Sequence, residues 1–177
     1  WAVMYDPIAQ VWNKFDGATG KVVNISDAIG YPMFMESYDK PAPAPAYGIA
    51  GWTADGNNVF LYDAYDWWKI DLTGERQPEC LTKGYGRKHG KSIRIMTSNI
   101  DKDVFQKDEK VIVSLWDKDT MDEGVYQLDM KGRLRKLMEG NYVYTIHRFS
   151  DNHEYCVWNR QNVSEFRDLW WSKSDFS

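Results

Sequence analysis

The chain has 177 residues, with 22 basic and 26 acidic side chains and a formal net charge of −4. This length suffices for one ordinary domain, and a mean hydropathy of −0.61 without an apolar run near 18 residues excludes a membrane-spanning helix. The acidic balance gives no electrostatic reason to expect nucleic acid as a partner. Nine Trp, eleven Tyr and seven Phe favour β structure.

The first expected strands cover 1–5, 10–16 and 22–26, with a Gly17/Gly20 turn before the third. A long connection follows at 27–46, where the alternating prolines of 41–45 favour extended polyproline geometry. Connections of this length usually run over the surface. We therefore expect 27–46 to be a linker outside the core.

Three later segments repeat one pattern. Each has an aromatic residue and, three positions later, an Asp or Asn that starts a tight turn, as in Trp52 and Asp55, Phe105 and Asp108, and Phe149 and Asn152. A buried strand follows, then in the first two segments a strand that closes with Asp-x-x-Gly and a short strand containing Leu. Strands are expected at 47–51, 59–63, 67–71 and 79–82; at 92–96, 111–117, 125–129 and 134–138; and at 142–146, 155–159 and 169–173.

Four antiparallel strands per unit, at spacings of 53 and 44 residues, describe the blades of a β-propeller. The predicted fold is all-β, a β-propeller fragment of about four antiparallel blades, two complete and two partial. The blades cover 1–26, 47–82, 92–138 and 142–177, with the linker at 27–46. A β-sandwich is the alternative, but it does not require the same turn signature in each unit.

The blade pattern has two further consequences. The first and last blades lack a strand each, so we expect this chain either to self-associate through open blade edges or to be the ordered part of a longer protein. The pairs Trp67-Trp68 and Trp170-Trp171 occupy equivalent positions in the repeat, so both are expected in the core between blades.

Three stretches carry a resemblance to a known family: AYGIAGWTAD at 46–55, YDAYDWWKID at 62–71 and LTKGYGRK at 81–88. They resemble the N-terminal propeller of bacterial serine peptidases of the prolyl oligopeptidase family. The Trp-x-x-Asp-Gly turn and the Leu-Thr blade ending also look like TolB-type propellers.

The resemblance implies a propeller that restricts peptide access to an α/β-hydrolase domain of the same parent chain, in a periplasmic or secreted peptidase. The family's Ser-Asp-His triad belongs to that domain, and no serine here has the G-x-S-x-G frame of its nucleophile. No catalytic residue is therefore assigned. The alternative is a TolB-like binding module for protein or glycan partners; a propeller lyase or glycosidase is weaker, because inner strands carry few His or carboxylates.

Five residues are candidates for binding substrate or a partner. Asp63, Tyr65 and Asp66 surround a loop between two strands, where the acids either face a ligand or cap turns, as Asp does routinely. Arg87 and Lys88 lie in a connection between blades and either contact an acidic surface or are exposed charges. We prefer the interpretation that the two acids cap turns and that the two basic residues are exposed charges in a connection between blades.

No metal or cofactor is predicted. The acidic run 117–123 lacks the ligand order of an EF-hand loop, and a solvated hairpin explains it equally well. The three histidines are separated, and Cys80 and Cys156 lack metal-ligand spacing, so we expect both thiols to be buried and free.

Overall fold

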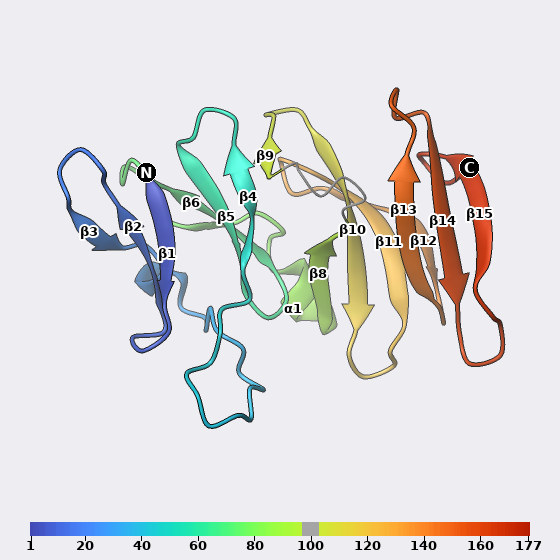
Figure 1. The fold of residues 1–177 in the computed structure, drawn as a ribbon, viewed down its shortest axis with the longest axis horizontal. Coiled ribbons are helices and arrows are strands. Elements are labelled where there is room, and N and C mark those ends of the chain that lie inside the picture. Colours follow the sequence, from blue (N-terminus) through green and yellow to red (C-terminus); the bar gives the residue numbers. More distant parts are fainter. Residues whose placement is uncertain (97–102) are drawn as a thin grey trace. The chain divides into compact units, whose positions relative to one another are not determined.

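A computed structural model describes residues 1–96 and 103–177 (Figure 1). The described chain forms two compact units. The first contains 1–84 together with 103–107, and the second contains the remaining residues. Each unit holds two β-sheets.

The first unit contains a three-stranded and a five-stranded sheet. The first sheet, in the order β1-β2-β3, is antiparallel throughout. The second has the order β7-β6-β5-β4-β9. The bounds are β1 (Ala2–Asp6), β2 (Val11–Phe15), β3 (Val22–Asn24), the 3₁₀ turn η1 (Asp27–Ile29), β4 (Ile49–Thr53), β5 (Asn58–Tyr62), β6 (Trp67–Asp71), β7 (Glu79–Cys80) and β9 (Val104–Phe105).

The second unit contains a four-stranded and a three-stranded antiparallel sheet, in the orders β12-β11-β10-β8 and β13-β14-β15. A short helix precedes them. The bounds are α1 (Tyr85–His89), β8 (Lys91–Ile95), β10 (Lys110–Asp117), β11 (Glu123–Asp129), β12 (Leu134–Gly140), β13 (Val143–Phe149), β14 (Tyr155–Gln161) and β15 (Asp168–Lys173).

The predicted fold class is confirmed: the described chain is nearly all β, with four sheets whose consecutive strands pair antiparallel, and β9 adds to the second sheet in parallel. The Asp-x-x-Gly signature works as local chemistry predicts. The Asp71 carboxylate accepts backbone N–H groups from Thr73, Glu75 and Arg76, and Gly74 takes a positive φ of 85°. Asp129 and Gly132 repeat this arrangement one blade later.

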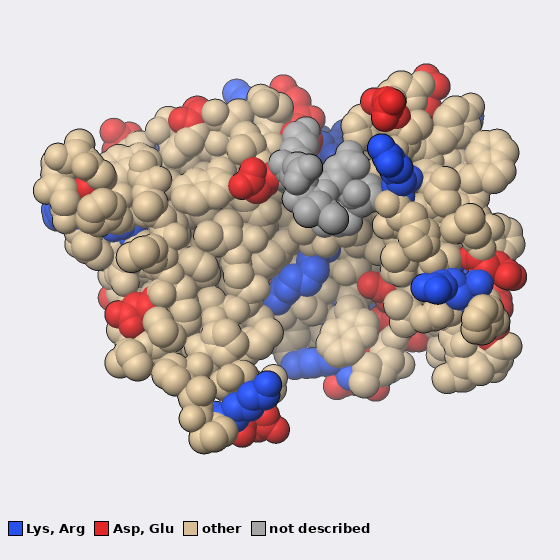
Figure 2. All heavy atoms as spheres, viewed as in Figure 1, with Lys and Arg blue, Asp and Glu red and all other residues tan. Residues whose placement is uncertain are grey.

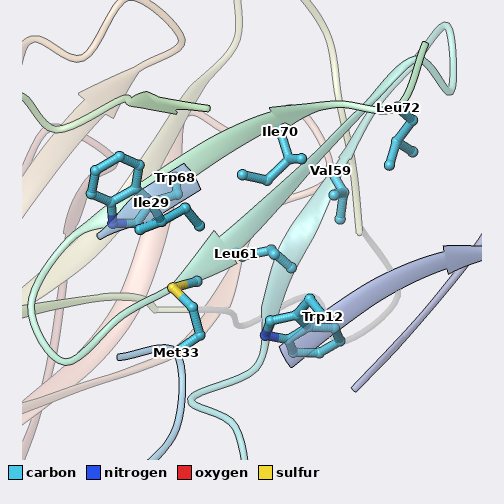
Figure 3. Close-up of a cluster of buried hydrophobic side chains, with 8 residues drawn as sticks. All are labelled: Trp12, Ile29, Met33, Val59, Leu61, Trp68, Ile70 and Leu72. Atoms are coloured by element: carbon cyan, nitrogen blue, oxygen red, sulfur yellow. The ribbon is translucent and has the colours of Figure 1, made fainter. Parts of the chain in front are cut away.

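A buried cluster joins the two sheets of the first unit (Figure 3). Trp12 comes from the first sheet, and the second sheet contributes Val59, Leu61, Trp68, Ile70 and the adjoining Leu72. The linker supplies the remaining two members, Ile29 and Met33.

The expectation that 27–46 lies outside the core is therefore wrong in part. Ile29 and Met33 are almost fully buried. The Tyr5 hydroxyl donates to the Ala44 carbonyl, and the Tyr47 N–H donates to the Met33 carbonyl. Burying two large apolar side chains outweighs the tendency of a proline-rich connection to remain in solvent.

A second cluster joins the two sheets of the other unit. Val125 of β11 packs with Tyr144 and Ile146 of β13 and with Cys156 and Trp158 of β14. Both cysteines are free as expected, but only Cys156 is buried; Cys80 is half-buried. Burial is the main cause that raises the pKa of each thiol.

Phe105 departs from its predicted position in the repeat. Its equivalence with Trp52 placed it at the end of the first strand of the third blade. Instead, β9 pairs in parallel with β4 of the preceding blade, with Trp52 opposite Val104. The Phe105 ring lies 5.8 Å from the Phe60 ring and 6.3 Å from the Trp67 ring, measured between centroids. Apolar packing on the neighbouring sheet overrides the local repeat.

The two tryptophan pairs have different environments. Trp67 and Trp68 are 0% and 9% exposed, as predicted, whereas Trp170 and Trp171 are 42% and 73% exposed. Trp68 pairs across strands with Leu61, which is buried against the first sheet, and Trp170 pairs with Trp158 of the second unit's core. The structural equivalent of Trp68 is thus Trp170. The sequence repeat had matched Trp68 with Trp171, which is one residue too far along this strand. Because neighbouring side chains alternate, Trp171 lies on the face of the sheet opposite Trp170.

Candidate functional site

The loop between β5 and β6 contains three of the five candidate residues. Asp63 directly follows β5 and is 0% exposed. One carboxylate oxygen accepts the backbone N–H groups of Tyr65 and Asp66, at 2.7 and 2.6 Å, and the other accepts the indole N–H of Trp68 at 3.0 Å. These contacts fix the loop and orient a core tryptophan.

Asp66 connects the same loop to the end of the blade. Its carboxylate accepts the Thr82 hydroxyl at 2.6 Å, and the Thr82 oxygen in turn accepts the Trp67 N–H at 3.2 Å. The Leu81 N–H donates to the Trp67 carbonyl. The Leu-Thr blade ending is thus held by a buried polar chain that begins at Asp66. This geometry agrees with the structural interpretation of both acids.

Tyr65, Arg87 and Lys88 are the candidates whose side chains reach solvent. Tyr65 and Arg87 are half-buried, and Lys88 is exposed. Arg87 and Lys88 lie on α1, although the sequence predicted an irregular connection there. The rings of Tyr85 and His89, four residues apart on α1, are 4.4 Å apart between centroids, which is the contact that a helical turn produces.

The acidic run 117–123 forms a hairpin between β10 and β11. The Asp117 carboxylate accepts the N–H groups of Asp119 and Thr120, and these hydrogen bonds keep its pKa below the usual range. Among the residues that the structure describes, no three His, Cys, Asp or Glu side chains are grouped to hold a metal ion. In the same residues, no helix is long and apolar enough to cross a membrane. Acidic and basic side chains are interspersed on the face drawn in Figure 2.

Sequence reasoning missed an ion-pair cluster on the four-stranded sheet of the second unit. Glu139 of β12 lies 2.6 Å from the Lys91 ammonium and 3.1 Å from that of Lys136, and it accepts the Tyr126 hydroxyl at 3.2 Å. The hydrogen bond from Lys91 is the main cause that lowers the Glu139 pKa to about 2. Lys91 and Glu139 are 48 positions apart, so their pairing has no local signal.

Replacing Glu139 by Gln is expected to change how stability depends on pH. Because the folded carboxyl has a pKa of about 2, below its ordinary 4.5, Glu139 stabilises the fold above about pH 4.5, and this contribution is lost as the pH falls toward 2. The free energies of unfolding of wild type and Glu139→Gln, measured in urea, should differ by about 0.5–1 kcal/mol near pH 7, since the ion pairs are partly solvated. The two values should converge near pH 2.

The exposed Glu154 provides a matched control for this titration. Glu154→Gln should leave the stability nearly unchanged across this pH range, because Glu154 forms no ion pair among the residues that the structure describes. An energy difference between wild type and Glu139→Gln that does not vary with pH would contradict the assignment.

Comparisons of this chain with protein-family models, with curated proteins and with solved structures gave no match.

Proposed function

We propose that this chain is a non-catalytic propeller segment of a prolyl oligopeptidase family serine peptidase, where it restricts peptide access to an α/β-hydrolase domain of the same parent chain. The observation that carries the proposal is the structural role of residues 46–82, which contain most of the three stretches that resemble the family. Trp52 lies in β4, Asp55 accepts the Asn57 N–H in the following turn, and Asp71 closes the next. These residues have structural roles in a blade. In this proposal the catalytic groups belong to another domain.

The proposal gives the five candidate residues two kinds of role. Asp63 and Asp66 hold the β5–β6 loop through buried hydrogen bonds. Tyr65, Arg87 and Lys88 reach solvent and would contact the peptide substrate or the hydrolase domain. The nucleophile, the general base and the orienting acid belong to that domain, in a periplasmic or secreted protein.

The direct test uses the full-length product of the gene that encodes this chain. We expect its further coding sequence to contain a G-x-S-x-G elbow followed by Asp and His. A fluorophosphonate probe should label the full-length protein, and replacing the elbow serine by Ala should abolish the labelling. A coding sequence that completes the propeller without a hydrolase would refute the peptidase assignment and favour the TolB-like binding module.

A second measurement tests the gate itself. In the full-length enzyme, Phe105→Ala should loosen a blade from within, because Phe105 is buried against Phe60 and Trp67 of its own unit. It should raise the cleavage rate of a long polypeptide relative to that of a short chromogenic peptide. An unchanged ratio, with serine labelling intact, would reject the gating role while leaving the peptidase assignment in place.

A further inference from the structure

The edge of β4 that faces away from β5 accepts a short parallel strand. β9 lies beside it (Figure 1), with Trp52 opposite Val104. The Trp52 N–H donates to the Asp103 carbonyl at 2.6 Å, and the Ala54 N–H donates to the Phe105 carbonyl at 3.0 Å. Main-chain hydrogen bonds of this kind are those by which an extended peptide adds to the edge of a sheet.

The same edge is shaped to receive an aromatic ring. The Phe105 side chain is 2% exposed and packs on the rings of Phe60 and Trp67. Gly51 of β4 leaves the necessary space, because a methyl group there would lie 2.5 Å from the Phe105 ring and 2.6 Å from the Asp103 carbonyl oxygen. A glycine inside a strand often marks the close approach of another backbone. The edge therefore fits both the main chain and one large side chain of an added strand.

The strand at this edge comes from an unusually long connection. β4 and β5 are joined by 54–57, and β13 and β14 are joined by 150–154, whereas β8 and β10 are joined by 96–109. β10 pairs directly with β8, so this hairpin does not need a strand on the preceding sheet in order to close. Connections as long as 96–109 are uncommon in compact domains and often carry function. β9 is thus an addition to the blade pattern.

We propose that the edge of β4 is a binding site for an extended peptide with an aromatic side chain, and that 103–105 occupies it as a built-in ligand. The backbone of β4 supplies affinity, and the space beside Gly51 selects the aromatic residue. The residue before the aromatic is not selected, since Val104 is 39% exposed. As part of the same chain, β9 has a high effective concentration and competes with free peptide. This inference rests on the contacts of β9 and does not depend on the peptidase assignment.

Vacating the site tests the proposal. The probe is the capped peptide Asp-Val-Phe-Gln-Lys, which copies 103–107, and its dissociation constant is measured by isothermal titration calorimetry. Phe105→Ala should bind the peptide at least about tenfold more tightly than the wild type, because the built-in strand no longer holds the site with its ring. Phe105→Leu keeps most of the apolar volume, so its affinity should lie between the two. A peptide with Ala in place of Phe should bind neither variant.

Gly51→Ala separates binding at the edge from binding to a loosened core. Its methyl group displaces the Phe105 ring and excludes the ring of an added peptide equally. This variant should therefore lose the β9 contact, as Phe105→Ala does, and yet not bind the peptide. Val104→Ala, an exposed change in the same strand, should bind it as weakly as the wild type. In Phe105→Ala, the amide NMR signals of Trp52 and Ala54 should shift when the peptide is added.

Three results would overturn the proposal. The first is that neither Phe105→Ala nor Phe105→Leu binds the peptide, although Phe105→Leu keeps the wild-type circular dichroism spectrum; β9 would then be a permanent strand of the sheet. The second is equal affinity of the wild type and both variants, which would mean that β9 does not occupy the binding site. The third is binding that persists in Gly51→Ala, which would place the peptide elsewhere on the chain.

Discussion

Asp63→Ala is expected to lower the free energy of unfolding by about 3–5 kcal/mol, because three N–H donors lose a charged acceptor and each buried donor left unsatisfied costs about 1–3 kcal/mol. The substitution leaves the Trp68 indole and two backbone N–H groups without the acceptor that they have in the wild type. Because Asp63 is fully buried, water does not readily replace the carboxylate. Urea unfolding monitored by tryptophan fluorescence measures the loss.

Two variants serve as controls for Asp63→Ala. Asp63→Asn keeps one side-chain oxygen that can accept the two loop N–H groups, so its effect should be smaller. Asp55→Ala removes a turn acceptor in solvent, where water replaces it, and should cost least. A loss below about 1 kcal/mol for Asp63→Ala would mean that the carboxylate is not needed by the fold. The ligand-binding interpretation of Asp63 would then regain support.

Phe105→Ala is expected to lower the free energy of unfolding by about 3–5 kcal/mol, the usual cost of removing a buried phenylalanine ring. Phe105 is 2% exposed and packs on Phe60 and Trp67. Its loss also removes the apolar anchor of β9, which is bonded to β4 through the N–H groups of Trp52 and Ala54. Chemical unfolding at fixed pH gives the difference.

Val104→Ala is the matched control, because Val104 lies in the same two-residue strand with its side chain exposed. It should cost well under 1 kcal/mol, as is usual for surface changes. Gly51→Ala provides an independent route to the same contact, since a methyl group at Gly51 would lie 2.5 Å from the Phe105 ring and 2.6 Å from the Asp103 carbonyl oxygen. Equal stabilities of Phe105→Ala and Val104→Ala would show that β9 is not held by its aromatic ring.

The local features of the fold were predictable from particular residues. Asp71 with Gly74 and Asp129 with Gly132 specify tight turns through hydrogen bonds within five positions, and the structure forms both. The turn role of Asp63 was also predictable from the sequence, because its carboxylate accepts N–H groups of residues two and three positions later. The exposed Lys88 and the half-buried Arg87 were found as charges, but the short helix that carries them was not.

Features that depend on distant contacts were not predictable. Glu139 meets Lys91 because β12 and β8 lie on either side of β11 and β10 in one sheet. Met33 enters the first core because the connection folds back and Tyr47 bonds to its carbonyl. Neither contact can be predicted from the residues that are adjacent in the sequence.

The sequence by itself determined the antiparallel blades of this protein, because alternation along strands and short polar turn residues act within a few positions. The tertiary structure alone decided which faces are covered. Trp68 and Trp171 sit in similar sequence contexts, yet one is buried and the other exposed, because a one-residue offset in pairing turns a side chain to the opposite face. It likewise decided that Phe105 belongs to the preceding sheet, since burial against Phe60 and Trp67 outweighs the local repeat.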